Sequence, residues 1–302
     1  MTESAFSTLP DSTLPEMQRT EISWAVLQLK ALGVHDVLHF DFISPPPVPS
    51  MMYALELLYS LGALDDSSAI TPIGIEMADM PVEPRLAKCI LSSLDMGCSE
   101  EILTIAAMCS VDYPFVTIRS RNKEAKQRLI ECSAEFSVPI SDHLTLLNIY
   151  SQYQNAGLNF SWCDSMCLQS RVMARAHEVR ERLYGMLKSY ASKKQSLAGE
   201  GRGITSCEED DEIVRKCLVC GYFANAAQLG AGGKYWTVRG RLPVSLHPTS
   251  VLSRFGAPSE WVLFHEVTHG DASTDIREVT KIEPRWLLEF AHHYYDTSRI
   301  RK

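Results

Sequence analysis

The hydrophobic pattern changes its period once along the chain, and this change limits the folds that are open to it. Up to about residue 228, apolar residues mostly recur at every third or fourth position, which predicts amphipathic helices. From residue 235 onward they gather in short β-branched and aromatic runs separated by Gly- and Pro-bearing turns, which predicts a small barrel. The chain is therefore predicted to be an α+β protein of several domains.

Turn signals and composition divide the chain further. At 302 residues it is long enough for two domains or three small ones. Helices followed by a turn-linked β segment predict a helix-plus-wing module over 15–80, after a flexible tail at 1–14. The other predicted segments are a helical bundle over 81–190, a charged linker rich in Gly and Ser over 191–212, a last bundle helix over 213–228, and a barrel with a C-terminal helix over 229–302.

The balance of charge limits how the chain can meet other molecules. Asp and Glu number 37 against 29 Lys and Arg, and the formal net charge is -8. A uniformly basic nucleic-acid coat is thereby excluded, and contact with RNA or DNA requires a local patch. No apolar run approaches the ~20 residues that span a bilayer, so no membrane partner is expected. Residues 1–15 have neither a basic nor an apolar region and do not form a signal peptide.

The nine cysteines favour a reducing compartment. Their number is odd, and most lie inside apolar stretches such as 105–109, where a free thiol behaves as a small hydrophobic group. The one CxxC, formed by Cys217 and Cys220, has no second pair of Cys or His to complete a tetrahedral site. No metal is predicted there.

Residues 265–269 (HEVTH) match the zinc-binding pattern HExxH. That pattern requires a helix, on which the two His lie on one face and reach the same ion. Here WVLF precedes the motif at 261–264, and Val267 and Thr268 are β-branched, so a strand is predicted instead. On a strand His265 and His269 would be ~13 Å apart, too far for one ion. We therefore expect no zinc at this pair.

A second motif, GAGGK at 230–234, has some features of a phosphate-binding loop. It lacks the required Gly and the Ser or Thr, because Gln228 and Tyr235 occupy those positions. It also follows a helix and precedes a strand, the reverse of the order that points a helix N-terminus at phosphate. A turn is predicted here.

A series of longer motifs resembles the region that follows the second RecA domain in DEAH-box RNA helicases. The motifs follow the family order from about residue 15 to 296, and together they are far more specific than any one alone. They are PEMQRT at 15–20, VLQLKALG at 26–33, DF at 41–42 with PPP at 45–47, ALELLY at 54–59, LGALD at 61–65, PRLAK at 84–88, CSEE at 98–101, DHLTLLN at 142–148, WC at 162–163, VR at 179–180, GYFANAA at 221–227 and HPTSVL at 247–252.

The resemblance implies a winged helix, a ratchet-like helical bundle and an OB-fold over the segments defined above. It also implies a module that closes over single-stranded RNA, with ATP and Mg²⁺ bound only in the RecA domains. The Walker A loop, the DEAH box and the arginine-rich last motif are absent from the 302 residues. We therefore expect no enzyme activity and no cofactor in this chain, which would be either the product of a truncated gene or a stand-alone C-terminal piece. Ser141 stands where the family usually has Gly, which leaves the local turn in doubt.

Candidate RNA-binding residues follow from a positive groove combined with stacking surfaces. Val172, Val179 and Leu183 are predicted to anchor the 170–190 helix, with its arginines on a neighbouring face. The candidates are Arg171, Arg175 and Arg182 on that helix, Arg119, Arg121 and Lys123 in the preceding loop, and Tyr235, Trp236 and His247 in the barrel. For the arginines the alternative is a solvated face with Glu178 paired to Arg182, and for the aromatic pair it is the barrel core.

Two functions from different classes stay open. The first is an RNA-binding and regulatory module of a DEAH-box helicase in pre-mRNA splicing or RNA processing. The second is a protein-interaction module that docks a glycine-patch activator or a spliceosomal scaffold without touching RNA, which the acidic balance favours. A metalloenzyme acting through HExxH is a third alternative. The resemblance implies a nuclear location, and a cytoplasmic one stays open.

Overall fold

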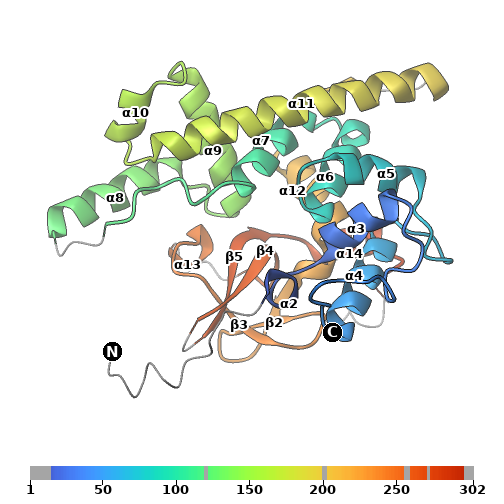
Figure 1. Cartoon of the computed structure of the whole chain (residues 1–302). Helices are drawn as coiled ribbons and strands as arrows, with labels where there is room; N and C mark the ends of the chain where they lie inside the picture. Colours follow the sequence, from blue (N-terminus) through green and yellow to red (C-terminus); the bar gives the residue numbers. More distant parts are fainter. Residues whose placement is uncertain (1–14, 119–121, 199–202, 255–258, 271–272, 296–302) are drawn as a thin grey trace. The chain divides into compact units, whose positions relative to one another are not determined.

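The chain divides into two compact units, Met1–Asp79 and Met80–Lys302. The computed structural model describes residues 15–118, 122–198, 203–254, 259–270 and 273–295 (Figure 1). No described helix combines the length with the continuous apolar surface that a bilayer crossing requires.

The first unit is a small helical domain with a wing. Its helices are α2 (Glu16–Arg19), α3 (Ser23–Ala31), α4 (Val48–Ser60) and α5 (Pro72–Asp79). Leu27, Leu57 and Met77 from three of these helices are fully buried and form the core. An antiparallel bridge between Leu64 and Ile70 forms the wing. This is the winged helix that the sequence predicts.

The second unit begins with a bundle of helices. They are α6 (Pro84–Met96), α7 (Ser99–Cys109), α8 (Lys123–Phe136), α9 (Asp142–Asn155), α10 (Phe160–Ser165), α11 (Ser170–Ala198) and α12 (Asp211–Tyr222). Helix α7 lies at the centre, where Ile102, Leu103 and Ile105 have no exposed surface. Gly221 lets α12 approach α6 closely, because a Cβ at that position would lie 2.1 Å from the Arg85 carbonyl oxygen.

The helix boundaries differ from the predicted ones in two places. Helix α11 continues to Ala198, eight residues into the predicted linker, because Ala191 is buried and Lys194 pairs with Asp95 at 2.9 Å. At the other end of the linker, the Asp210 carboxylate caps α12 by accepting hydrogen bonds from the N–H groups of Glu212 and Ile213. Of the five acidic residues at 208–212, Asp210 therefore caps the helix and Asp211 and Glu212 begin it, while 208–209 form a turn.

The predicted last bundle helix over 213–228 is also too long. Helix α12 ends at Tyr222 and is followed by the 3-10 turn η1 (Phe223–Asn225) and by β1 (Ala226–Leu229). Two alanines at 226 and 227 have high helix propensity, but pairing with strands on both sides buries them completely. Tertiary packing therefore overrides the local preference at this point.

The second half of this unit is a closed five-stranded barrel. After β1 the strands are β2 (Tyr235–Thr237), β3 (Pro243–Leu246), β4 (Trp261–His269) and β5 (Thr274–Lys281), with the short helices α13 (Val251–Arg254) and α14 (Pro284–Phe290). The strand order is β1-β2-β3-β5-β4, with all pairs antiparallel except β3 with β5. Val262, Ile276 and Val279 fill the interior. This is the OB-type barrel that the sequence predicts.

The start of α9 joins the bundle to the barrel. Asp142 is buried, and its carboxylate accepts hydrogen bonds from the N–H groups of Val251 and Val279, each at 2.7 Å. The Ile140 carbonyl accepts from the Lys281 N–H at 2.8 Å. Bundle and barrel therefore share a hydrogen-bonded joint.

Ser141 resolves the doubt about the turn before this helix. Its backbone is extended and its hydroxyl accepts from the Leu144 N–H at 3.1 Å, so it is the N-cap of α9. The same hydroxyl lies 2.6 Å from the Thr280 hydroxyl in the barrel. A serine therefore serves at this position without any need for glycine.

Candidate nucleic-acid interface

The arginine stripe on α11 projects from a firmly packed helix. Arg171, Arg175 and Arg182 are all exposed, while Met173 and Leu183 are buried against the rest of the bundle. Val172 and Val179 are half-buried, so the buried face lies slightly to one side of the predicted one. The stripe can therefore reach a ligand without moving its helix.

Among the described residues, the one acidic residue that pairs with this stripe does so only weakly. Glu178 pairs with Arg175 at 3.0 Å, and not with Arg182 as the alternative interpretation assumed. Both side chains of the pair are 67% exposed, and ion pairs of this kind contribute about 0–1 kcal/mol. A phosphate group could therefore displace the glutamate at little cost.

Arg180, on the same helix, has a different role that the sequence pattern did not reveal. It is buried, and its Nε donates to the Thr104 hydroxyl at 2.9 Å, while its Nη2 donates to the Glu100 carboxylate. Its guanidinium also lies over the Tyr150 ring, 5.7 Å from the centroid. This arginine holds α11 against α7 and α9 and is not available to RNA.

The loop candidates are only partly described. Lys123 is exposed at the first position of α8, where Asn122 caps the helix. Arg119 and Arg121 lie outside the described residues.

The two aromatic candidates on β2 point to opposite sides of the strand. Tyr235 is 3% exposed in the barrel core, and its hydroxyl donates to the Ser259 carbonyl at 2.8 Å. Trp236 is 41% exposed and lies next to Gly230, where a Cβ would come within 2.6 Å of the indole ring. Of the two, only Trp236 presents a face on which a base could stack.

His247 is half-buried just after β3. Its Nδ1 lies 2.6 Å from the Thr249 hydroxyl. Burial, with the positive charge of Arg277 nearby, lowers the pKa of His247 below its ordinary value. This shift favours the uncharged ring, which could offer a phosphate a neutral hydrogen bond.

The candidate residues are not gathered in one place. Figure 1 shows α11 on one side of α7 and α9, with the barrel on the other side. The arginine stripe and Trp236 therefore belong to two separate surfaces of this unit.

A cavity of about 580 Å³ lies where the bundle meets the barrel. Its acidic lining residues outnumber the basic ones, Arg254 and Arg277, and both arginines already have oxygen partners: Ser133 at 2.8 Å and Glu266 at 3.4 Å. The acids are Asp112, Asp142, Glu266 and Glu278. This excess of carboxylates disfavours a phosphate group. This cavity cannot be predicted from the sequence, since its lining comes from segments between 108 and 278 that only the fold brings together.

Glu278 is the most unusual carboxyl in this cavity. Its φ of 46° lies in the left-handed region, although it stands in strand β5. Burial raises its pKa to about 7, against the lowering effect of Arg277 and with support from Glu266. At neutral pH the group is therefore only partly ionised.

This shift predicts a pH-dependent stability. A carboxyl whose pKa is higher in the folded state than in the unfolded chain favours folding while protonated, and the contribution disappears as the pH rises through the folded-state value. The step from 4.5 to about 7 corresponds to about 3 kcal/mol, which the 21% exposure of the side chain reduces to an expected ~1–2 kcal/mol. In a chelating buffer, denaturant unfolding should show Glu278→Gln more stable than the wild type by this amount at about pH 8, and equal to it at about pH 4. An equal difference at both pH values would contradict the assignment.

The HExxH residues lie on a strand, as predicted. His265 and His269 are both in β4, where His269 is exposed and His265 is half-buried. The His265 Nδ1 lies 2.6 Å from the Tyr222 hydroxyl, and burial lowers the pKa of His265 to about 4. The two rings therefore occupy different environments.

Comparison with protein families assigns the same architecture. A helicase-associated winged-helix domain matches residues 54–82, a ratchet-like helicase-associated domain (HA2) matches 83–146, and an oligonucleotide/oligosaccharide-binding (OB) fold matches 214–294. The chain therefore consists of helicase-associated domains followed by an OB-fold.

Individual relatives of the chain are RNA helicases. The chain is 41% identical over 295 residues to the probable ATP-dependent RNA helicase DHX35 of Homo sapiens, covering 97% of this chain and 40% of the relative. It is 39% identical over 296 residues to the pre-mRNA-splicing factor ATP-dependent RNA helicase prp22 of Schizosaccharomyces pombe, covering 97% of this chain and 24% of the relative. The chain therefore matches the C-terminal helicase-associated and OB-fold part of DEAH-box RNA helicases. It spans two-fifths or less of the length of these relatives.

Proposed function

We propose that this chain binds single-stranded RNA as the C-terminal module of a DEAH-box helicase that acts in pre-mRNA splicing or another nuclear RNA-processing step. The observation that carries the proposal is the winged helix, ratchet-like bundle and OB-fold, which occur in one chain that matches RNA helicases over 97% of its length. The splicing role rests on the name of one relative, and spliceosomal components are the partners that it suggests.

The arginine stripe is the surface that we assign to the RNA backbone. Arg171, Arg175 and Arg182 lie within about 40° of one another around the helix axis, because four residues advance 40° and eleven advance 20°. They are exposed on a long helix whose opposite face is buried, so their spacing is fixed before RNA arrives. Contacts of this kind hold phosphates and do not read bases.

Trp236 is the second contact that we assign. An exposed indole on a barrel strand offers a stacking face that accepts any base. Because it lies away from the stripe, the two surfaces can be tested separately. Tyr235 is left out of this assignment, since its ring is in the core.

The proposed function of this chain does not include ATP hydrolysis. Phosphoryl transfer requires a phosphate-binding loop, Mg²⁺ ligands and an arginine finger, and the 302 residues contain no motif for any of them. We propose that the chain by itself binds RNA without consuming ATP.

A salt titration tests the stripe. The variant with Arg171, Arg175 and Arg182 all changed to Ala should bind a short single-stranded RNA more weakly, whatever its sequence. The slope of log K against log salt should flatten by about 2, because each phosphate contact on a single strand contributes about 0.7. Fluorescence anisotropy of the full chain with a labelled oligonucleotide gives both quantities.

A charge-matched control separates the stripe from the net charge. Arg19, Lys188 and Arg285 are exposed basic residues off the stripe, and changing all three to Ala removes the same charge. The control should retain the wild-type slope. If the stripe variant keeps the wild-type RNA affinity and salt slope, the stripe is only a solvated face. That result would favour the alternative function, a protein-interaction module.

A further inference from the structure

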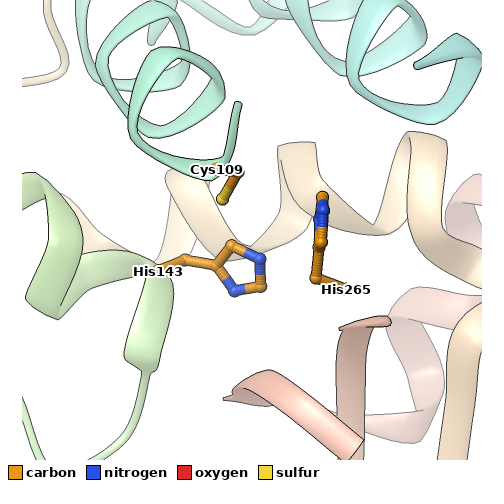
Figure 2. A group of neighbouring side chains, drawn as sticks. All are labelled: Cys109, His143 and His265. Carbon is orange, nitrogen blue, oxygen red and sulfur yellow. The ribbon is translucent and has the colours of Figure 1, made fainter. Parts of the chain in front are cut away.

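Three potential metal ligands meet beside the cavity, from three separate elements. Cys109 ends α7, His143 is the second residue of α9, and His265 lies in the middle of β4. One ligand atom from each side chain lies within 4.8 Å of those of the other two. Figure 2 shows the cysteine sulfur and the two imidazole rings directed toward one another.

Both histidines are held in position through the same ring nitrogen. The His143 Nδ1 lies 2.7 Å from the Thr280 hydroxyl, and the His265 Nδ1 lies 2.6 Å from the Tyr222 hydroxyl. A histidine whose Nδ1–H is donated to an oxygen presents its Nε2 lone pair to a metal. With the proton on Nδ1 in both rings, each Nε2 would be available as a metal ligand.

The other ring nitrogen of His143, Nε2, has no hydrogen-bond partner among the described residues. His143 is completely buried, and its Nε2 contacts no hydrogen-bonding group within the described part of the chain. An unpaired polar atom in a protein interior is costly, and few native structures retain one without a reason. In Figure 2 this side of the ring faces His265.

We propose that Cys109, His143 and His265 bind one Zn²⁺ ion. A thiolate with two imidazoles is a donor set that zinc favours, whereas Ca²⁺ and Mg²⁺ require oxygen ligands. The ligand atoms around tetrahedral zinc lie ~3.3–3.8 Å apart, so the three side chains would move inward by about 1 Å. The fourth coordination position would face the cavity, which Cys109 and His265 both line and through which the ion can enter.

The ion would join the bundle to the barrel. Two of its ligands belong to bundle helices and the third belongs to a barrel strand, so binding favours the folded arrangement of both. The site differs from the HExxH pair that the sequence presents, because only His265 is common to the two. The proposal departs from the sequence-based expectation that the chain holds no metal, and the metal analysis below decides between them.

Metal analysis of the full chain tests the proposal. After purification under reducing conditions and equilibration with zinc, the wild-type chain should retain one zinc per chain on dialysis. Cys109→Ser and His265→Ala should each weaken zinc binding by ~100-fold or more and lose it on dialysis. Titration of the metal-free chain with Co²⁺ should give a thiolate-to-cobalt charge-transfer band, a readout that requires no variant to fold.

Matched controls distinguish this site from others on the chain. His269→Ala removes the second histidine of HExxH, and Cys163→Ser removes a buried thiol outside the cluster. Both should keep the zinc and the cobalt band. Absence of the band in the wild type, stoichiometric copper in place of zinc, or equal loss of zinc in His269→Ala and His265→Ala would overturn the proposal.

Discussion

Replacing Asp142 with alanine should lower the free energy of unfolding by about 3–5 kcal/mol. The carboxylate is buried and accepts two backbone N–H groups, those of Val251 and Val279, each at 2.7 Å. Alanine would leave both donors without a partner in the interior, and each such group costs about 1–3 kcal/mol. Because one donor is in β5 and the other begins α13, the loss should fall on the joint between bundle and barrel.

Equilibrium unfolding in denaturant measures this loss, with two further variants for comparison. Asp142→Asn keeps one acceptor oxygen and should lose about half as much stability. Asp164→Ala removes an exposed carboxylate of α10 and should change stability by less than about 0.5 kcal/mol. Equal stability of the Asp142→Ala variant and the wild type would show that water or a rearranged side chain satisfies the two N–H groups.

Replacing Arg180 with alanine should lower the free energy of unfolding by about 2–4 kcal/mol. The guanidinium donates to Thr104 and Glu100 and lies over the Tyr150 ring, so its removal breaks contacts between three helices. This loss of unfolding free energy is smaller than the loss expected on breaking a fully buried ion pair. The reason is that the Glu100 side chain is 35% exposed and regains water when its partner is removed.

Two variants make this second prediction specific. Arg180→Lys keeps the charge but loses the planar fork, and should recover only part of the stability. Arg182→Ala, two residues along the same helix but exposed, should be nearly neutral in denaturant unfolding. If the Arg180→Ala and Arg182→Ala variants proved equally stable, the buried network would contribute little to the fold.

The order of folds could be predicted from the sequence because it depends on local pattern. Short β-branched runs predicted the strand that contains 261–269, against the competing HExxH interpretation. The misplaced boundaries lie where tertiary packing overrides local propensity. Ala226 and Ala227 favour a helix locally, but they lie in β1, which pairs with a strand on each side. The polar residues after 190 stay helical because Lys194 forms an ion pair with Asp95 on α6.

The candidate site was harder to predict, since an exposed and a buried arginine look alike in a sequence. Arg180 and Arg182 are two residues apart on one helix, yet the first is 8% exposed and the second projects into solvent. Tyr235 and Trp236 differ in the same way on β2. The cluster of Cys109, His143 and His265 could not be predicted at all, because its members are far apart in the chain and meet only when barrel and bundle pack together.

The closure of the barrel decides how a protein partner can attach to it. The parallel pairing of β3 with β5 completes the ring, so each of the five described strands has a neighbour on both sides. A peptide that binds by adding itself to a sheet needs a free strand edge, and two copies that aggregate through their sheets need the same. Among the described strands, the edge that stays unpaired is limited to the parts of β4 and β5 beyond their short pairings with β1 and β3. A protein that docks elsewhere on this barrel must recognise its side chains and loops, and its specificity will follow from their shape and charge.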